Sequence, residues 1–394
     1  MEVSARREIL PLKIVFLLVY FCTFFGFGAF FPLLSVYLKN EMKLSGTEIG
    51  MIMSISPIVT IFIQPLWGMI CDYTKKPVTV LTTAFVLTAL FSVMYSSVHQ
   101  YTWIVVMAVL LAFTQSAIVP ISDSITLNYV QKTSGNYGSI RLWGSIGFAF
   151  AGLVGGWLSE TFSLVAIFYI LTFMLLLSAG LAWKLPREGH SMNTAVVRGM
   201  AQLFKIPKFV LFLAAAFLVF GPIYANNFYF GVFVEEMGGT LTGVGFAFLL
   251  AAGSEAPFMK MTDKLTRRYG MITILAFAAT VSALRWFFYF FEPPLWLIYV
   301  TTVAQGFSVG LFIPVALQYV RETAPESVRV TAVSLYSAVS NGLGSWFCTV
   351  IGGYILDKSH ASDIYWFFSL LTVAGLAILA IIALWDRKRM KDIS

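Results

Sequence analysis

Long apolar segments recur along the whole chain and constrain its fold more than any other feature. Twelve can be counted, mostly separated by short polar turns, over residues 11–37, 48–70, 77–97, 102–128, 139–160, 162–184, 208–233, 240–260, 271–291, 295–319, 329–355 and 364–385. About 20 apolar residues in a helix cross the hydrocarbon core of a bilayer, where a helix satisfies its own backbone groups. The sequence therefore predicts an all-α polytopic membrane protein with twelve transmembrane helices.

Composition excludes the main alternative, a water-soluble protein. Of the 394 residues, 59% are hydrophobic and 11% are charged, whereas soluble domains carry about 25% charged residues.

The cysteines Cys22, Cys71 and Cys348 lie far apart in or near apolar segments. Their spacing predicts neither a metal site nor a disulfide framework, and no cofactor is expected. The first apolar run has no small-residue cleavage site and is therefore interpreted as a span and not a cleaved signal peptide.

The distribution of basic residues predicts how the chain is oriented in the membrane. One alternating set of loops carries most of the Lys and Arg residues, and the opposite set holds only Lys39, Lys43 and Lys358. Lys and Arg accumulate in cytoplasmic loops. With an even number of spans, both termini are expected in the cytoplasm of a multi-pass protein of the cell membrane. The net charge of +7 then reflects topology, and no nucleic-acid partner is expected.

The chain is predicted to consist of two six-span halves, residues 1–184 and 208–394. The intervening residues 185–207 are polar and basic and contain Pro and Gly, which indicates a cytoplasmic linker. The Gly-Gly pair that ends span five recurs at the end of span eleven, at Gly155-Gly156 and Gly352-Gly353. Repeats of this kind are a transporter architecture.

A short motif follows span two and consists of Gly68, Asp72, Lys75 and Lys76. A glycine lets two helices approach closely, and the aspartate can meet a helix N-terminus or an arginine. A second copy follows span eight, with Asp263, Arg267 and Arg268, and with Met259 where the glycine would stand. The motif resembles the gate motif of the major facilitator superfamily. With twelve spans and a half-length repeat, the resemblance covers essentially the whole chain and implies two pseudo-symmetric halves that alternate access to a central site.

Spans four and five each carry a charge, Asp123 and Arg141. Ionisable residues within spans usually face a partner or a watery cavity. The run Tyr137–Phe148 is similar to the branch of the superfamily that includes lactose permease, phenylpropionate permease and nucleoside/proton symporters. This resemblance implies that Asp123 and Arg141 bind the substrate, and that Phe148 replaces a tryptophan that stacks on the sugar ring. The alternative is an ion pair that serves folding or gating.

The second half has an analogous set of charges, Glu255 in span eight and Arg285 in span nine, both flanked by apolar residues. The resemblance places Arg285 on a functional arginine of the branch. Glu255 lies about one helical turn out of register with a substrate-binding glutamate. The alternative is a purely structural Glu–Arg pair.

Spans seven and ten add amides. Gln305 stands in span ten where the branch carries a histidine linked to proton coupling, and it cannot exchange a proton near neutral pH. Proton symport would therefore require a carboxylate, and Glu255 and Asp123 are the candidates. Asn226 and Asn227 in span seven suit hydrogen bonding to a substrate ring. Alternatively, they bond neighbouring helices.

Together these patterns predict a secondary active transporter for a small organic solute, an aromatic acid, a sugar or a nucleoside. Proton-coupled symport by a monomer is expected, with no metal and no catalytic residue, since no nucleotide-binding or hydrolase motif is present. The main alternative is a proton-driven exporter of drugs or metabolites.

Overall fold

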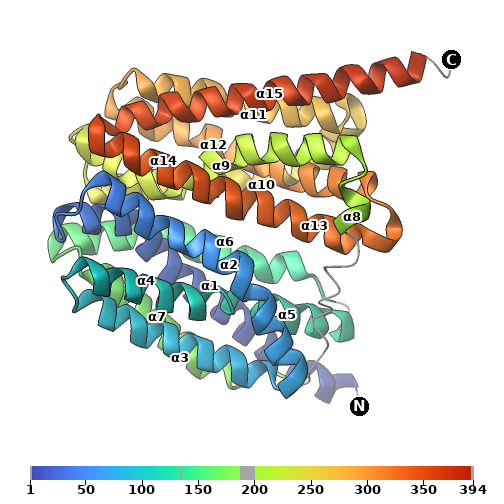
Figure 1. Cartoon of the computed structure of the whole chain (residues 1–394). Coiled ribbons are helices and arrows are strands. Elements are labelled where there is room, and N and C mark those ends of the chain that lie inside the picture. The colour runs from blue at the N-terminus through green and yellow to red at the C-terminus, as the bar shows by residue number, and fades with distance from the viewer. Residues whose placement is uncertain (1, 134, 187–199, 392–394) are drawn as a thin grey trace. The chain divides into compact units, whose positions relative to one another are not determined.

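The structure, a computed structural model, describes residues 2–133, 135–186 and 200–391. In these ranges the chain is helical and contains no strand (Figure 1). The first series of helices is α1 (Glu2–Asn40), α2 (Gly46–Thr74), α3 (Pro77–Ser96), α4 (Tyr101–Gln115), α5 (Ile118–Thr133), α6 (Tyr137–Thr161) and α7 (Ala166–Ala182). The second is α8 (Met200–Leu203), α9 (Pro207–Glu236), α10 (Leu241–Tyr269), α11 (Met271–Phe290), α12 (Leu295–Thr323), η1 (Glu326–Val328), α13 (Arg329–Ser337), η2 (Ala338–Gly344), α14 (Ser345–Lys358) and α15 (Ala361–Lys391).

Every predicted span coincides with helical structure, which confirms the predicted fold class. Ten segments of the described chain are long and apolar enough to cross a membrane. The sixth span, α7, is apolar but has only 17 residues. The eleventh is divided into α13, a π-helical turn η2 and α14. Span four also departs from one regular helix, because Ser116 and Ala117 separate α4 from α5.

The described helices fall into two compact units. Unit 1 comprises Met1–Leu44, Ile58–Thr194 and Thr240–Leu249, and unit 2 comprises Ser45–Pro57, Ala195–Gly239 and Leu250–Ser394. The first turns of α2 thus belong to unit 2, and the first turns of α10 belong to unit 1. The predicted division at 1–184, 185–207 and 208–394 stays a prediction, and residues 187–199 of that linker lie outside the described residues.

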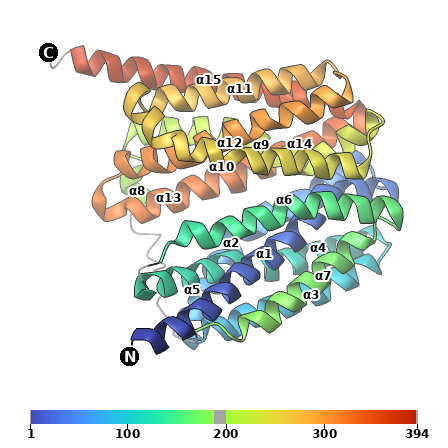
Figure 2. The same cartoon turned by 180° about the vertical axis from the view of Figure 1, so that it is seen from behind.

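In unit 1, α1 packs against α6 and α7, and α3 packs against α7 and α4 (Figures 1 and 2). Small residues at Gly147, Ala151 and Gly155 give α6 a smooth face toward α1. A Cβ atom added to Gly155 would lie 2.9 Å from Cβ of Ala29. Small residues at four-residue spacing let membrane helices approach closely. This seam fixes α6 beside α1 and so positions the side chains that both helices contribute to the candidate site.

In unit 2, α15 packs against α9 and α11, and α9 contacts η2 and α14 (Figure 2). Aromatic rings fill the space between α11 and α15. The rings of Trp286 and Tyr365 stack with centroids 5.6 Å apart, and the ring of Tyr289 lies 5.2 Å from that of Tyr365. All three side chains are fully buried. This aromatic cluster packs around the polar network of unit 2 described below.

Candidate functional site

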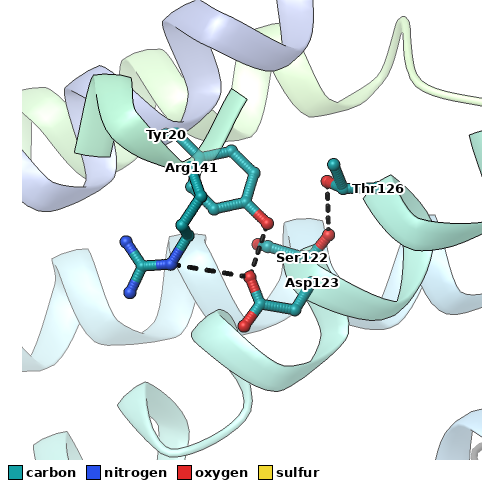
Figure 3. A network of polar contacts seen from close by, with 5 residues as sticks. All are labelled: Tyr20, Ser122, Asp123, Thr126 and Arg141. Atoms are coloured by element: carbon teal, nitrogen blue, oxygen red, sulfur yellow. Dashed lines mark hydrogen bonds and ion pairs between the residues drawn. The ribbon is translucent and has the colours of Figure 1, made fainter. Parts of the chain in front are cut away.

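Unit 1 brings Asp123 of α5 and Arg141 of α6 together with a residue of α1 that the sequence did not mark, Tyr20 (Figure 3). The Tyr20 hydroxyl donates to Oδ1 of Asp123 at 2.5 Å. The same oxygen lies 4.0 Å from Nε of Arg141, at the outer limit of an ion pair. The side chains of Arg141 and Asp123 are 32% and 27% exposed. Asp123 therefore has a tyrosine as its main partner and is only loosely tied to Arg141.

Local features of α5 and α6 position this pair. The side chain of Asn136 accepts a hydrogen bond from the amide of Ser139 and so caps the N-terminus of α6, one turn before Arg141. In α5, the hydroxyl of Thr126 donates to the carbonyl oxygen of Ser122 at 2.7 Å (Figure 3). The second turn of each helix thus presents its charged residue toward the other.

A glycine makes room for the arginine. A Cβ atom on Gly144 would lie 2.9 Å from Nη1 of Arg141 and 2.8 Å from Cδ2 of Phe24. In the space left free, Cζ of Arg141 lies 4.1 Å from the centroid of the Phe24 ring and 5.7 Å from that of Tyr20. Both distances suit a cation–π interaction. The cluster thus combines a guanidinium, a carboxylate and two aromatic faces.

Phe148 lies seven residues after Arg141, about two helical turns along α6. Its ring is half-buried and contacts the Phe248 ring edge to face, with centroids 6.3 Å apart, within unit 1. The predicted aromatic face at this position is therefore present. Its contact with a substrate stays a prediction.

Unit 2 brings together the predicted amides in one network centred on Gln305 of α12. Its Oε1 accepts from Nη2 of Arg285 at 2.8 Å and from Nδ2 of Asn226 at 3.2 Å. Its Nε2 donates to Oδ1 of Asn227 at 3.5 Å. The Tyr365 hydroxyl completes the network by donating to Oδ1 of Asn226 at 3.1 Å. Four helices, α9, α11, α12 and α15, are thereby joined.

Arg285 is 5% exposed and has aromatic rather than acidic neighbours. Its Cζ lies 4.2 Å from the centroid of the Trp286 ring and 5.1 Å from that of Tyr289. Among the described residues no ion pair joins it to Glu255, so the structural Glu–Arg pair that was the alternative for this half is not formed. Nε of Arg285 has no hydrogen-bond partner within the described chain. Instead of a counter-ion, Arg285 uses π faces and one amide oxygen.

Glu255 lies elsewhere in unit 2, on α10, where it is half-buried. Its backbone packs against α12, because a Cβ added to Gly310 would lie 2.8 Å from the carbonyl oxygen of Glu255. Among the described residues no ion pair joins Glu255 to a basic side chain. The structure therefore places Glu255 outside the Gln305 network but on a helix that packs against α12, the helix of Gln305.

The two gate motifs lie at helix ends. In unit 1, Asp72 is half-buried in the last turn of α2, and Lys75 has a positive φ of 53° where the helix ends. In unit 2, the motif lines an open hollow of about 490 Å³ at the end of α10, together with two further lysines: Lys260, Asp263, Lys264, Arg267 and Arg268. Gly68 is buried within α2.

The sequence analysis did not identify the aromatic residues that contact Asp123 and Arg141 in unit 1 or the Gln305 network in unit 2. Tyr20, Phe24 and Tyr365 belong to aromatic-rich runs with no polar motif around them. A weak signal was present for Tyr20 and Phe24, which are four residues apart and therefore share one helix face.

With the geometry in place, comparison with known proteins decides the family. Residues 13–386 match the family model described as the MFS_1 like family. The chain belongs to this family. As a member of the major facilitator superfamily, it is a multi-pass membrane transport protein and not an enzyme.

The relatives of this MFS_1 like protein are permeases. It is 55% identical over 376 residues to the maltose permease of Geobacillus stearothermophilus, covering 95% of each chain. It is 26% identical over 368 residues to the probable 3-phenylpropionic acid transporter of Escherichia coli K12, covering 91% of this chain and 94% of the relative. The crystal structure of the nucleoside transporter NupG superposes with a TM-score of 0.84 at 17% identity, covering 94% of this chain and 98% of the other. These matches confirm the predicted branch, and the last confirms the fold.

Proposed function

We propose that this chain is a secondary active importer of maltose or a closely related disaccharide, driven by proton symport through alternating access of its two halves. The similarity that carries the proposal is 55% identity with a maltose permease over 95% of both chains. Relatives named for other solutes are far less similar, at 26% identity.

The unit 1 cluster suits such a substrate. A carboxylate such as Asp123 accepts hydrogen bonds from sugar hydroxyls, and the guanidinium of Arg141 donates several in a fixed fork. The apolar faces of Phe24 and Phe148 can stack on a sugar ring. The loose contact of 4.0 Å between Arg141 and Asp123 supports this proposal, because a substrate hydroxyl can bridge the two groups without breaking a tight pair.

On the unit 2 side, Asn227, Gln305 and Glu255 are half-buried and so are available to a substrate. Asn226 and Arg285 are buried and hold Gln305 in place. Since Gln305 cannot titrate, the coupling proton is assigned to a carboxylate, with Glu255 preferred over Asp123. Asp123 already receives a short hydrogen bond from Tyr20.

The remaining parts of the proposal concern topology and gating. Both termini and the linker 185–207 are placed in the cytoplasm, and the protein is proposed to act as a monomer. The motifs with Asp72 and Asp263 are assigned to the cytoplasmic gate, because charged groups at helix ends can stabilise one conformation of the cycle over another.

Uptake of radiolabelled maltose into right-side-out vesicles tests the function. We expect accumulation above the external concentration when the vesicles are energised, and its loss when a protonophore collapses the proton gradient. A panel with a nucleoside and 3-phenylpropionate serves as the control for substrate class. Efflux without uptake would favour an exporter, and uptake of only the aromatic acid or the nucleoside would refute the sugar assignment.

A charge exchange tests the role of the unit 1 pair. If Asp123 and Arg141 only tie two helices together, Asp123→Arg combined with Arg141→Asp should restore much of the transport that each single change removes. If they bind the sugar, the exchanged pair meets each hydroxyl with the wrong group, and transport stays lost. Recovery in the exchanged protein would remove the pair from the binding site.

A further inference from the structure

The eleventh span contains a structural irregularity that the site described above does not use. Between α13 and α14 the backbone widens into the π-helical turn η2, Ala338–Gly344. Such turns are rare, weaken the regular hydrogen-bond ladder and occur frequently at functional sites. The hydroxyl of Ser340 donates to the carbonyl oxygen of Tyr336 at 2.7 Å within this turn.

Close packing against α9 holds the π turn in place. A Cβ atom on Gly221 of α9 would lie 2.7 Å from the carbonyl oxygen of Gly344 and 2.8 Å from Sγ of Cys348. Gly221 and Gly344 therefore allow the two backbones to touch. The turn is a fixed feature of unit 2 and faces the helix that also carries Asn226 and Asn227.

The eleventh span exposes two chemically different faces. On one, the large apolar side chains of Leu343, Trp346 and Tyr354 are 42%, 38% and 50% exposed. On the other, Ser334 and Ser337 are half-buried and Asn341 is exposed. These three follow one another at intervals of three and four residues, which places them on one helix face.

The second face is suited to water and not to lipid. A polar side chain in the middle of a span almost always faces a protein interior or a water-filled cavity, because hydrocarbon offers it no partner. Asn341 lies 12 residues after Arg329 and 17 before Lys358, close to the middle of the span. Its exposure therefore indicates a cavity.

The amide of Asn341 is oriented for a ligand. Its Oδ1 lies 3.1 Å from Oγ of Ser340 and shares the one proton of that hydroxyl with the carbonyl oxygen of Tyr336. Within the described chain, Nδ2 has no hydrogen-bond partner. A fixed amide with two unused N–H groups is a donor for a hydroxyl oxygen.

We propose that Asn341, presented by the π turn η2, donates a hydrogen bond to a hydroxyl of the transported sugar and contributes to substrate specificity. This inference rests on the proposed function, because it takes the hydroxyl-rich solute from it. Ser337 and Ser334 extend the same polar face toward the α13 end of the span.

Substrate kinetics test the hydrogen bond. Asn341→Ala should raise KM for maltose uptake about five-fold with little change in maximal rate, as expected for one lost hydrogen bond. Asn341→Asp keeps the size and shape of the side chain but lacks the N–H donors, so it should also raise KM. Leu343→Ala, on the apolar face of the same turn, is the matched control and should leave KM unchanged.

Monodeoxy analogues of maltose provide a readout that a merely structural role would not move. The wild type should discriminate against one analogue that lacks the contacted hydroxyl. Asn341→Ala should lose this discrimination while keeping that against the other analogues. Unchanged KM and unchanged discrimination in both Asn341 variants would overturn the inference.

Cysteine labelling separates this inference from the proposed function. The native cysteines are buried, so the background reaction with a charged methanethiosulfonate should be low. Asn341→Cys should react and maltose should protect it, whereas Leu343→Cys should not react. Failure of the wild type to take up maltose would refute the proposed function, whereas a lack of labelling at Asn341→Cys would refute the inference whatever the substrate is.

Discussion

At the scale of single residues, the shortest polar contact in the unit 1 cluster comes from Tyr20, whose hydroxyl donates to Asp123 at 2.5 Å. We predict that Tyr20→Phe raises KM for the transported sugar about ten-fold, since a hydrogen bond to a charged group contributes about 1.5–3 kcal/mol. The ring remains, so expression and thermal stability should change little. Uptake kinetics in vesicles measure the effect.

Tyr95→Phe is the matched control for this prediction. The hydroxyl of Tyr95 is buried in unit 1 and has no hydrogen-bond partner among the described residues. Its removal should leave KM unchanged. Equal KM values for Tyr20→Phe and the wild type would show that Asp123 does not depend on Tyr20.

The residue scale also shows what sequence can and cannot reveal about a site. Asp123, Arg141, Glu255 and Arg285 were found because a charge stands out in an apolar span. Tyr20 was not, since it is one of 17 tyrosines in a chain with 37 phenylalanines. The alternative for the second half, a structural pair of Glu255 with Arg285, rested on opposite charge alone. The pair does not form, because aromatic rings and Gln305 surround the guanidinium. Helix packing determines those neighbours, and the spacing of charges along the sequence does not reveal it.

At the scale of helices, hydropathy predicted every span but not the breaks within them. The separation of α4 from α5 at Ser116 and Ala117 is a local change in backbone hydrogen bonding, and the π turn η2 also involves the close contact between Gly221 and Gly344. Helix ends were also missed. α10 continues to Tyr269, nine residues beyond the predicted end of the span at residue 260, because helix formation does not stop where a bilayer does.

At the start of α10, hydrogen bonds to a carboxylate and a close glycine contact hold the helix in position. Within unit 1, the amide and hydroxyl of Thr242 donate to Oε2 of Glu160 at 3.1 and 2.7 Å, which places a carboxylate at a helix N-terminus. Gly245 lies so close to α6 that an added Cβ would be 2.6 Å from Cα of Leu153. The same features recur within unit 2, where the Thr47 hydroxyl donates to Oδ2 of Asp357 at 3.1 Å.

We predict that Gly245→Ala lowers the stability of the purified protein by roughly 1–3 kcal/mol, because the new methyl group meets backbone and cannot be accommodated by a side-chain rotation. Gly253→Ala on the same helix is the control, since nothing lies within 4 Å of its added Cβ. That change should be neutral or slightly stabilising. Thermal unfolding in detergent measures both, and equal midpoints would argue against the close contact.

At the scale of the whole molecule, the proposed transport cycle requires the two halves to change conformation, and we propose that the end of α2 controls this change. Asp72→Asn should reduce the transport rate while KM stays within a few-fold of the wild type, because the change shifts a conformational equilibrium and touches no substrate. Asp263→Asn, in the second copy of the motif that lacks the glycine, should have a smaller effect. A large loss of affinity with an unchanged maximal rate would place Asp72 in the binding site.

Proton coupling is the other part of the proposed function that concerns the whole molecule, and we propose that Glu255 carries it. The branch histidine is replaced by Gln305, which is engaged by Arg285, Asn226 and Asn227 and has no titratable proton. Glu255 is a half-buried carboxylate of unit 2 within an apolar span, with no ion pair to a basic residue of the described chain. Replacing it with glutamine mimics its protonated, neutral state. Glu255→Gln should abolish accumulation against a gradient yet preserve exchange of sugar across the membrane, since exchange needs no net proton movement.

Glu326→Gln, at a carboxylate 87% exposed to solvent, is the control and should retain both activities. Counterflow and energised uptake measured on the same vesicles decide the matter: a Glu255→Gln protein that still accumulates sugar with wild-type dependence on pH would exclude Glu255 as the coupling site.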